Sequence, residues 1–109
     1  MVHVKFSTSG GKFIGVECEG HAEYAEAGDD IVCAALSSVV QTAVLGVMRL
    51  VGVNIGYEVD DERGYLKAIL PKQLSPEEEH DADLILRTAY LGVSDLHENF
   101  SDFISLEVE

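Results

Sequence analysis

The first residues of the chain alternate between apolar and polar side chains. Val2, Val4 and Phe6 fall on one side of an extended segment, and polar residues such as His3 fall on the other. A period of two is typical of a β-strand with one buried face. Ser9-Gly10-Gly11 follows, and its glycines can take the positive φ angles that tight turns require. The pattern therefore predicts a strand that ends in a hairpin turn.

A second alternating run follows the turn and predicts the partner strand of the hairpin. One side of this run is apolar, with Ile14, Val16 and Cys18. The other side is expected to carry Phe13, Glu17 and Glu19. Gly20 ends the strand. Packing is the expected role of Cys18, because unpaired cysteines are commonly buried.

A long apolar segment, Ile31 to Val51, predicts a helix that ends near Gly52. Asp30 is expected to cap this helix, because a carboxylate there can accept hydrogen bonds from unpaired N–H groups. Apolar residues lie on almost every side, so we expect the helix to be deeply buried or shared between the subunits of a homodimer. Polar and charged residues within the segment favour a core helix over a membrane span: Ser37, Ser38, Gln41, Thr42 and Arg49.

The second half of the chain repeats the order of two strands and a helix. Val53 to Val59 and Tyr65 to Leu70 alternate, and the residues between them predict a turn. Ser75-Pro76-Glu77-Glu78 matches a capping box with proline at the first helical position. The helix that follows is expected to bury an apolar stripe: Leu84, Ile85, Ala89, Val93, Leu96 and Phe100. A last alternating segment, Phe103 to Val108, predicts a final strand.

These elements predict an α+β fold in a single domain over residues 1–109, with the order ββαββαβ. Hairpins followed by helices indicate two layers, in which two helices pack on a mixed or mostly antiparallel sheet. A chain of 109 residues, 47% of them hydrophobic, is large enough for one such core.

The composition narrows the classes of function. The net charge of −13 argues against nucleic-acid binding, which depends on Lys and Arg that neutralise phosphates. An acidic surface suits a basic protein partner, and simple solubility explains the same charge. Two cysteines are too few for the disulfide framework of a small secreted domain, and the opening residues lack the pattern of a signal peptide. A cytoplasmic location is therefore expected.

The residues around Cys33 carry the candidate chemistry. If Asp30 caps the helix, Cys33 lies in its first turn, where unpaired N–H groups and the helix dipole favour the nucleophilic thiolate. His21 lies at the end of the second predicted strand, across a loop from the start of the helix. An imidazole can accept the thiol proton and later donate it to a leaving amine. A Cys–His pair of this kind is an activated nucleophile.

Two other interpretations fit the same residues. A cysteine in an apolar helix is often inert packing. Cys18, His21 and Cys33 also have the donor atoms of a metal site, but they are three ligands where structural zinc generally takes four. His80 and His97 lie among acidic residues and are expected to be solvated. The residue pattern by itself leaves catalysis, packing and metal binding open.

A dense set of small, charged and nucleophilic residues spans positions 20–37: Gly20-His21-Ala22, Tyr24-Ala25, Gly28 and Asp30-Ile31-Val32-Cys33-Ala34-Ala35-Leu36-Ser37. This set resembles the signature of the ribosomal-processing cysteine proteases, the Prp family. The resemblance implies a catalytic dyad of Cys33 and His21. Gly20, Asp30 and Ser37 would match the other fixed residues of the family, in substrate-binding or supporting roles. The resemblance also implies a homodimer. No metal and no cofactor are expected.

The same resemblance implies a substrate. Members of the family remove an N-terminal extension from the bacterial large-subunit ribosomal protein L twenty-seven, cutting after aromatic residues and before a small one. The alternative is a non-catalytic binding or scaffold domain for a basic ribosomal partner, with Cys33 as packing. The segment from Ala22 to Asp29 contains no large aliphatic residue. We therefore hypothesise that it is a lid over the site, with Gly28 as a hinge.

Overall fold

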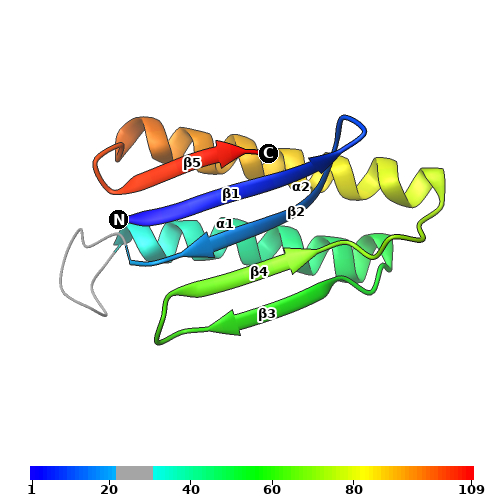
Figure 1. Ribbon diagram of the computed structural model, residues 1–109, viewed down its shortest axis with the longest axis horizontal. Coiled ribbons are helices and arrows are strands. Elements are labelled where there is room, and N and C mark those ends of the chain that lie inside the picture. Colours follow the sequence, from blue (N-terminus) through cyan, green and yellow to red (C-terminus); the bar gives the residue numbers. More distant parts are fainter. Residues whose placement is uncertain (22–30) are drawn as a thin grey trace.

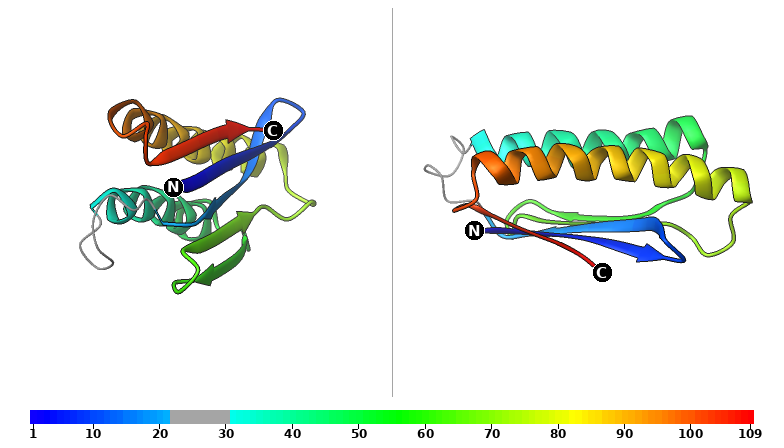
Figure 2. Two further views of the ribbon diagram at one scale, coloured as in Figure 1. Left: turned by 60° about the vertical axis from the view of Figure 1, so that its left-hand side comes forward. Right: turned by 90° about the horizontal axis from the view of Figure 1, so that it is seen from above.

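One sheet and two helices make up the structure, a computed structural model that describes residues 1–21 and 31–109 (Figure 1). Along the chain, the elements are β1 (Val2–Ser9), β2 (Lys12–Glu19), α1 (Ile31–Gly46), η1 (Val47–Val51), β3 (Gly56–Asp60), β4 (Tyr65–Ile69), α2 (Pro76–Asn99) and β5 (Ile104–Val108). Both helices cover the same face of the sheet, and the other face is open (Figure 2). The predicted α+β class and the order ββαββαβ are confirmed.

The five strands form a mixed sheet in the order β3-β4-β2-β1-β5. Three of the strand pairs are antiparallel, and the pair of β1 with β5 is parallel. β1 and β2 are therefore inner strands, while β3 and β5 are the two edges. This order brings the β3–β4 hairpin beside β2, although the two hairpins are separated in the chain by α1.

Phe13 lies on the opposite face from the one expected. The pairing of β1 with β2 shifts between Ser7 and Thr8, where Ser7 pairs with Gly15 and Thr8 pairs with Phe13. Ile14 is the extra residue of this β-bulge, and a bulge reverses the alternation on one side of it. Phe13 is consequently buried, with its ring 5.6 Å from Phe6 and 5.5 Å from Tyr90. The prediction that Phe13 shares a face with Glu17 and Glu19 was wrong.

The long apolar helix begins at Ile31 and runs through α1 and η1 to Val51, as predicted. Its last turn is a π-helix, closed by Gly52 in the left-handed conformation, whose N–H donates to the Val47 carbonyl. Only 33% of the most apolar 18-residue window in this stretch is buried, so one subunit does not bury the helix deeply. The other expectation, that the helix is shared between subunits, stays a prediction. The stretch is also long and apolar enough to cross a membrane by length and composition, a test that core helices of soluble proteins pass as well.

The second helix begins as the sequence predicts. The Ser75 hydroxyl accepts a hydrogen bond from the Glu78 N–H at 3.1 Å, and the Glu78 carboxylate accepts one from the Ser75 N–H at 2.9 Å. The predicted stripe is right in part, because Ala89 and Val93 are buried while Leu84 is 58% exposed. The other predicted members are partly buried: Ile85, Leu96 and Phe100. The buried residues follow the helical spacing of three and four: Ala82, Leu86, Ala89 and Val93.

The third strand is shorter than predicted, and its apolar residues are not all in the core. Val53 and Ile55 are buried, but they precede the strand, which begins at Gly56. Tyr57 and Val59 pair with β4 residues of the helix-covered face, yet both stay exposed. They lie on the edge strand, beyond the cover of α1 (Figure 2). This edge forms one wall of the site described next.

Candidate active site

Cys33 lies in the first turn of α1, as predicted. The helix begins at Ile31, so the thiol follows the first helical residue by two positions. Its side chain is half-buried and packs against the hydrophobic core, and it is not part of a disulfide. Backbone N–H groups in the first turn of a helix have no partner within the helix, and they favour negative charge nearby. The expected cap, Asp30, lies outside the described residues.

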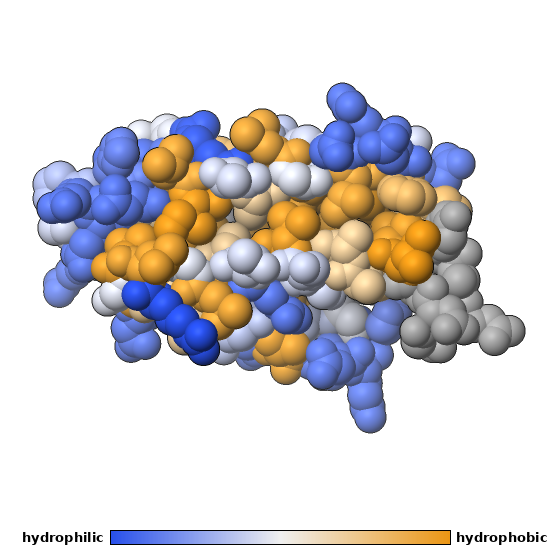
Figure 3. Space-filling view, turned by 180° about the vertical axis from the view of Figure 1, so that it is seen from behind, coloured by the Kyte–Doolittle hydropathy of each residue, from blue (hydrophilic) through white to orange (hydrophobic). Residues whose placement is uncertain are grey.

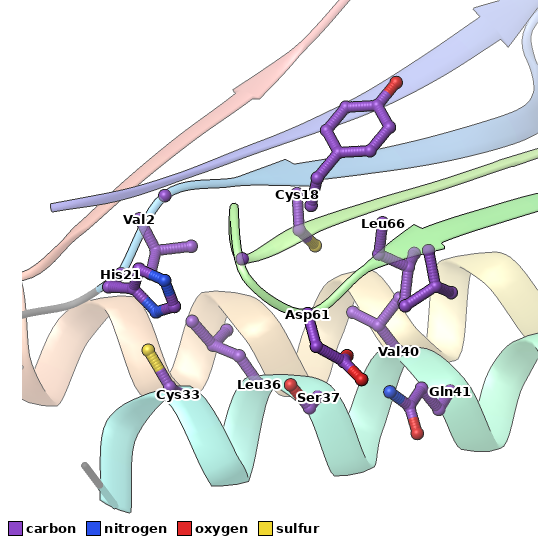
Figure 4. Close-up of a pocket in the computed structure, with 14 residues that line it drawn as sticks. Val2, Cys18, His21, Cys33, Leu36, Ser37, Val40, Gln41, Asp61 and Leu66 are labelled. Atoms are coloured by element: carbon purple, nitrogen blue, oxygen red, sulfur yellow. The ribbon is translucent and has the colours of Figure 1, made fainter. Parts of the chain in front are cut away.

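His21 faces Cys33 from the end of β2. Its imidazole ring lies over the Cys33 thiol in the close-up view (Figure 4). The Nε2 atom of His21 is 3.3 Å from the Glu62 carbonyl oxygen in the β3–β4 turn. When Nε2 carries the proton and donates to this carbonyl, Nδ1 is left as the acceptor nitrogen. The predicted Cys–His pair is therefore brought together by two separate elements.

Two glycines allow the backbone around His21 to pack closely. Gly20 has φ +97°, and a Cβ at this position would lie 2.7 Å from the Met1 carbonyl oxygen. Gly64 has φ +62°, and its Cβ would collide with the Gly20 carbonyl and lie 3.0 Å from His21 Cε1. The β3–β4 turn therefore touches the backbone that carries the histidine. Gly20 was predicted as a substrate-binding or supporting residue, and this role stays a prediction. The structure shows that a side chain at Gly20 would meet the Met1 backbone.

We expect Gly64→Ala to lower both stability and peptide cleavage. A left-handed φ costs a non-glycine residue about 1–2 kcal/mol, and the collision with Gly20 adds to this cost and displaces His21. Thermal unfolding and cleavage rates would be measured side by side. Gly10→Ala is the matched control, because Gly10 has φ +60° but nothing within 4 Å of the added Cβ. If Gly64→Ala were as active as Gly10→Ala, the turn would not position His21.

A cavity of about 150 Å³ opens beside the Cys–His pair. One wall is α1, which contributes Cys33, Ser37 and Gln41 at intervals of four residues (Figure 4). The opposite wall comes from β2, β4 and the end of β3: Cys18, Leu66, Val59 and Asp61. Ser37 is exposed and lines this cavity, so the structure brings it together with Cys33 and His21. The hypothesised lid, residues 22–29, lies outside the described residues.

Cys18 also lines the cavity, but its chemistry differs from that of a nucleophile. Burial, and secondarily the nearby Glu17 carboxylate, raises the pKa of the Cys18 thiol to about 12. The thiol is therefore almost fully protonated at neutral pH, and the protonated form is a poor nucleophile. This agrees with the expected role of Cys18 in packing.

We expect iodoacetamide to modify the protein once, at Cys33, at pH 7. Cys33 is half-buried at a helix start, whereas the raised pKa keeps Cys18 in the unreactive thiol form. The measurement is peptide mass mapping after brief labelling. Cys33→Ser is the control and should show almost no labelling in the folded state. Labelling of Cys18 at the same rate as Cys33 would contradict this assignment.

The alternative of a metal site finds no support in the described part of the chain. Residues 1–21 and 31–109 contain no group of three or more His, Cys, Asp or Glu side chains placed to hold a metal ion. Cys18, His21 and Cys33 are all among these residues. They line one cavity without forming a metal-binding cluster.

Several residues of the site were missed by the sequence interpretation. Gln41 has a readable signal, because it continues the spacing of four from Cys33 and Ser37 along the helix. Val59, Asp61 and Gly64 were assigned only to a strand and a turn. Nothing local shows that this turn lies against His21, since the contact depends on the order of strands in the sheet.

Comparisons with known proteins point to one family. The family described as cysteine protease Prp matches residues 1–105. The ribosomal processing cysteine protease Prp of Bacillus subtilis is 31% identical over 86 residues, which are 79% of this chain and 77% of the relative. The Prp of Staphylococcus aureus is 29% identical over 88% of this chain and 87% of the relative.

Solved structures share the fold over the full chain. The crystal structure of the S. aureus protease in complex with a covalently linked product peptide has a TM-score of 0.87 and 27% identity, and 100% of each chain is covered. SMU.848 from Streptococcus mutans has a TM-score of 0.85 and 28% identity, covering 99% of this chain and 93% of that one. On this sequence and structural evidence, the chain belongs to the Prp family of cysteine proteases.

Proposed function

We propose that this protease removes the N-terminal extension of the bacterial ribosomal protein L twenty-seven, with Cys33 as nucleophile and His21 as base. The observation that carries the dyad is the position of the His21 ring over the Cys33 thiol, at the mouth of a cavity (Figure 4). The net charge of −13 supports a basic ribosomal protein as the substrate, because opposite charges favour encounter.

The proposed first step is attack on the scissile peptide bond. His21 accepts the Cys33 proton, and the thiolate attacks the carbonyl carbon of the substrate. The carbonyl oxygen carries the negative charge of the tetrahedral intermediate until the C–N bond breaks. His21 then donates its proton to the departing amine. The product of this step is a thioester between Cys33 and the N-terminal fragment.

The second step hydrolyses this thioester. His21 accepts a proton from water, the resulting hydroxide attacks the thioester carbonyl, and the Cys33 sulfur leaves as the thiolate, which takes the proton back. The cavity wall of Ser37 and Gln41 is available to bind substrate beside the thiol. The covalent link between a product peptide and the S. aureus enzyme supports a covalent mechanism for the family.

The test is incubation with the ribosomal protein that carries its N-terminal extension, followed by intact-mass measurement. Two products whose masses add up to the substrate plus one water are expected, with a cut between an aromatic and a small residue. A mature ribosomal protein without the extension is the control and should remain intact. If the extended substrate remains intact at equimolar enzyme, the proposed substrate is wrong.

We also propose that the enzyme is a homodimer in the cytoplasm. The helix layer leaves an apolar groove of about 480 Å³ between α1 and α2, lined in part by Leu50, which is 84% exposed. Leu91 of α2 is 67% exposed, and apolar surface extends over this side of the molecule (Figure 3). Apolar surface of this extent favours an interface between subunits. The cytoplasmic location is supported by the absence of a disulfide between its two cysteines.

Light scattering is expected to give a mass of about twice 11.8 kDa at micromolar concentration. Leu50→Lys combined with Leu91→Lys should reduce the mass to that of one chain, because two charges would be buried in the interface. Val108→Lys on the edge strand β5 is the matched control, because Val108 is also exposed but does not line the groove, and it should leave the mass unchanged. A wild-type mass near 11.8 kDa would rule out the dimer.

A further inference from the structure

One charged side chain in the cavity is not used by the proposed dyad. Asp61 lies just after β3, in the turn that leads to β4, and it lines the same cavity as Cys33 and His21. Its carboxylate points across the cavity toward α1, where Ser37 and Gln41 stand on the facing wall (Figure 4). The Asp61 charge also raises the pKa of Tyr57, second to burial, which places the carboxylate near that phenol on β3.

The neighbours of Asp61 in the turn have other roles. The Asp60 carboxylate accepts hydrogen bonds from the N–H groups of Glu62 and Arg63, at 3.1 and 3.3 Å, and so shapes the turn. Arg63 pairs with Glu19 at 3.4 Å and stacks over the Tyr65 ring. The Asp61 carboxylate makes no hydrogen bond or ion pair with any residue in the described ranges 1–21 and 31–109.

The described residues that line the cavity offer this carboxylate no Lys or Arg. His21, the proposed base, faces the Cys33 thiol. Asp61 is exposed, so its carboxylate is accessible to solvent. A peptide that fills the cavity displaces part of this solvent, and an anion that loses water without gaining a partner raises the free energy of the complex. A substrate with a cationic side chain at this point avoids that penalty.

We propose that Asp61 is a specificity-determining residue that selects a Lys or Arg side chain close to the scissile bond of the substrate. The inference rests on the proposed dyad, because Cys33 marks the position of the scissile bond. The separation between Cys33 and Asp61 across the cavity then sets which substrate side chain meets Asp61. Exposed ion pairs give small preferences, and partial exclusion of water by the cavity walls strengthens them. We expect a preference of about 3- to 10-fold in kcat/KM for the cationic substrate.

The experiment compares pairs of peptides that differ only in one charge. A single lysine is placed in turn at each of the four positions on either side of the scissile bond, and each peptide has a partner with N-acetyl-lysine at that position. The acetyl group removes the charge and keeps the side chain. At one position, or two adjacent ones, the lysine peptide should be cut about 3- to 10-fold faster, and the ratio should fall as salt is added.

The readout in each variant is the ratio of the two rates, so a general change in activity does not affect it. Asp61→Asn should bring the ratio close to one. Asp61→Lys should prefer glutamate over lysine at the same position. Glu58→Gln is the matched control, because Glu58 pairs with Lys67 on the open face of the sheet and is not among the residues that line the cavity. It should keep the wild-type ratio.

Two results would overturn the inference and leave the protease assignment intact. The first is a wild-type ratio near one at all eight positions. The second is a clear lysine preference that survives in Asp61→Asn or disappears equally in Glu58→Gln. If the wild-type enzyme cut neither the peptides nor the extended ribosomal protein, the proposed function on which the inference rests would be wrong.

Discussion

Cys33→Ala is expected to abolish peptide cleavage and leave the fold in place. The substitution removes the only atom that forms the proposed thioester, and the loss of a nucleophile costs on the order of 10⁶-fold in rate. The volume removed is one sulfur atom at a half-buried position, so we expect a loss of stability of about 1 kcal/mol or less. Single-turnover cleavage and thermal unfolding measure the two effects separately.

Cys18→Ser is the matched control for this experiment. Both cysteines line the cavity, but only Cys33 stands in the first turn of α1, under the His21 ring. Cys18→Ser should still cleave the substrate, at some cost in stability, because a hydroxyl replaces a partly buried thiol. Cleavage by Cys33→Ala at close to the wild-type rate would overturn the assignment. If the two variants were equally inactive while folded, the thiols would be assigned the wrong way round.

His21→Ala is expected to lower kcat by about 10²- to 10⁴-fold with a much smaller change in KM. The imidazole is proposed to act in the chemical step, and general acid–base catalysis typically contributes a factor of this size. His21 is exposed, so its removal should leave the melting temperature nearly unchanged. The pH profile of kcat/KM gives a second readout, since the limb that reports the histidine should disappear.

His80→Ala provides the control for a histidine outside the site. His80 is exposed at the start of α2 and lies 3.1 Å from Asp81, and it does not line the cavity. Its removal should affect neither kcat nor the pH profile. A His21→Ala variant with unchanged kcat at saturating peptide would argue against the dyad, and a base would have to be sought elsewhere.

The parts of the fold that depend on local sequence could be predicted. The Ser75 capping box, the Gly10-Gly11 turn and the start of the helix at Ile31 each involve residues within a few positions of one another. Their physical causes are also local, namely unpaired helix N–H groups and positive φ angles. The sequence motif placed His21 and Cys33 at the ends of two adjacent elements, and the structure brings them face to face (Figure 4).

The parts that depend on distant pairings could not be predicted. The β-bulge at Ile14 places the Phe13 side chain on the opposite face of the sheet. The alternation of apolar and polar residues does not show where a bulge lies. Asp61 and Gly64 lie at the site because β4 pairs with β2. This pairing joins strands that are distant in the sequence, so the local residue pattern does not predict it. The misassignment of Leu84 has a different cause. The helix α2 contains more apolar residues than its buried face can accommodate, so the sequence does not show which of them are buried.

The parallel pairing of β1 with β5 affects the order in which the protein can assemble. This ladder joins Val2–Phe6 to Ile104–Val108, nearly the longest sequence separation that the chain allows. Contacts of high sequence separation form late, because the entropy of closing a long loop is lost before the contact is gained.

On the ribosome, β1, β2 and α1 emerge long before β5, so one edge of β1 stays unpaired for most of synthesis. An open strand edge invites pairing with other chains. Refolding at high protein concentration should therefore yield more aggregate than refolding of the same protein at high dilution.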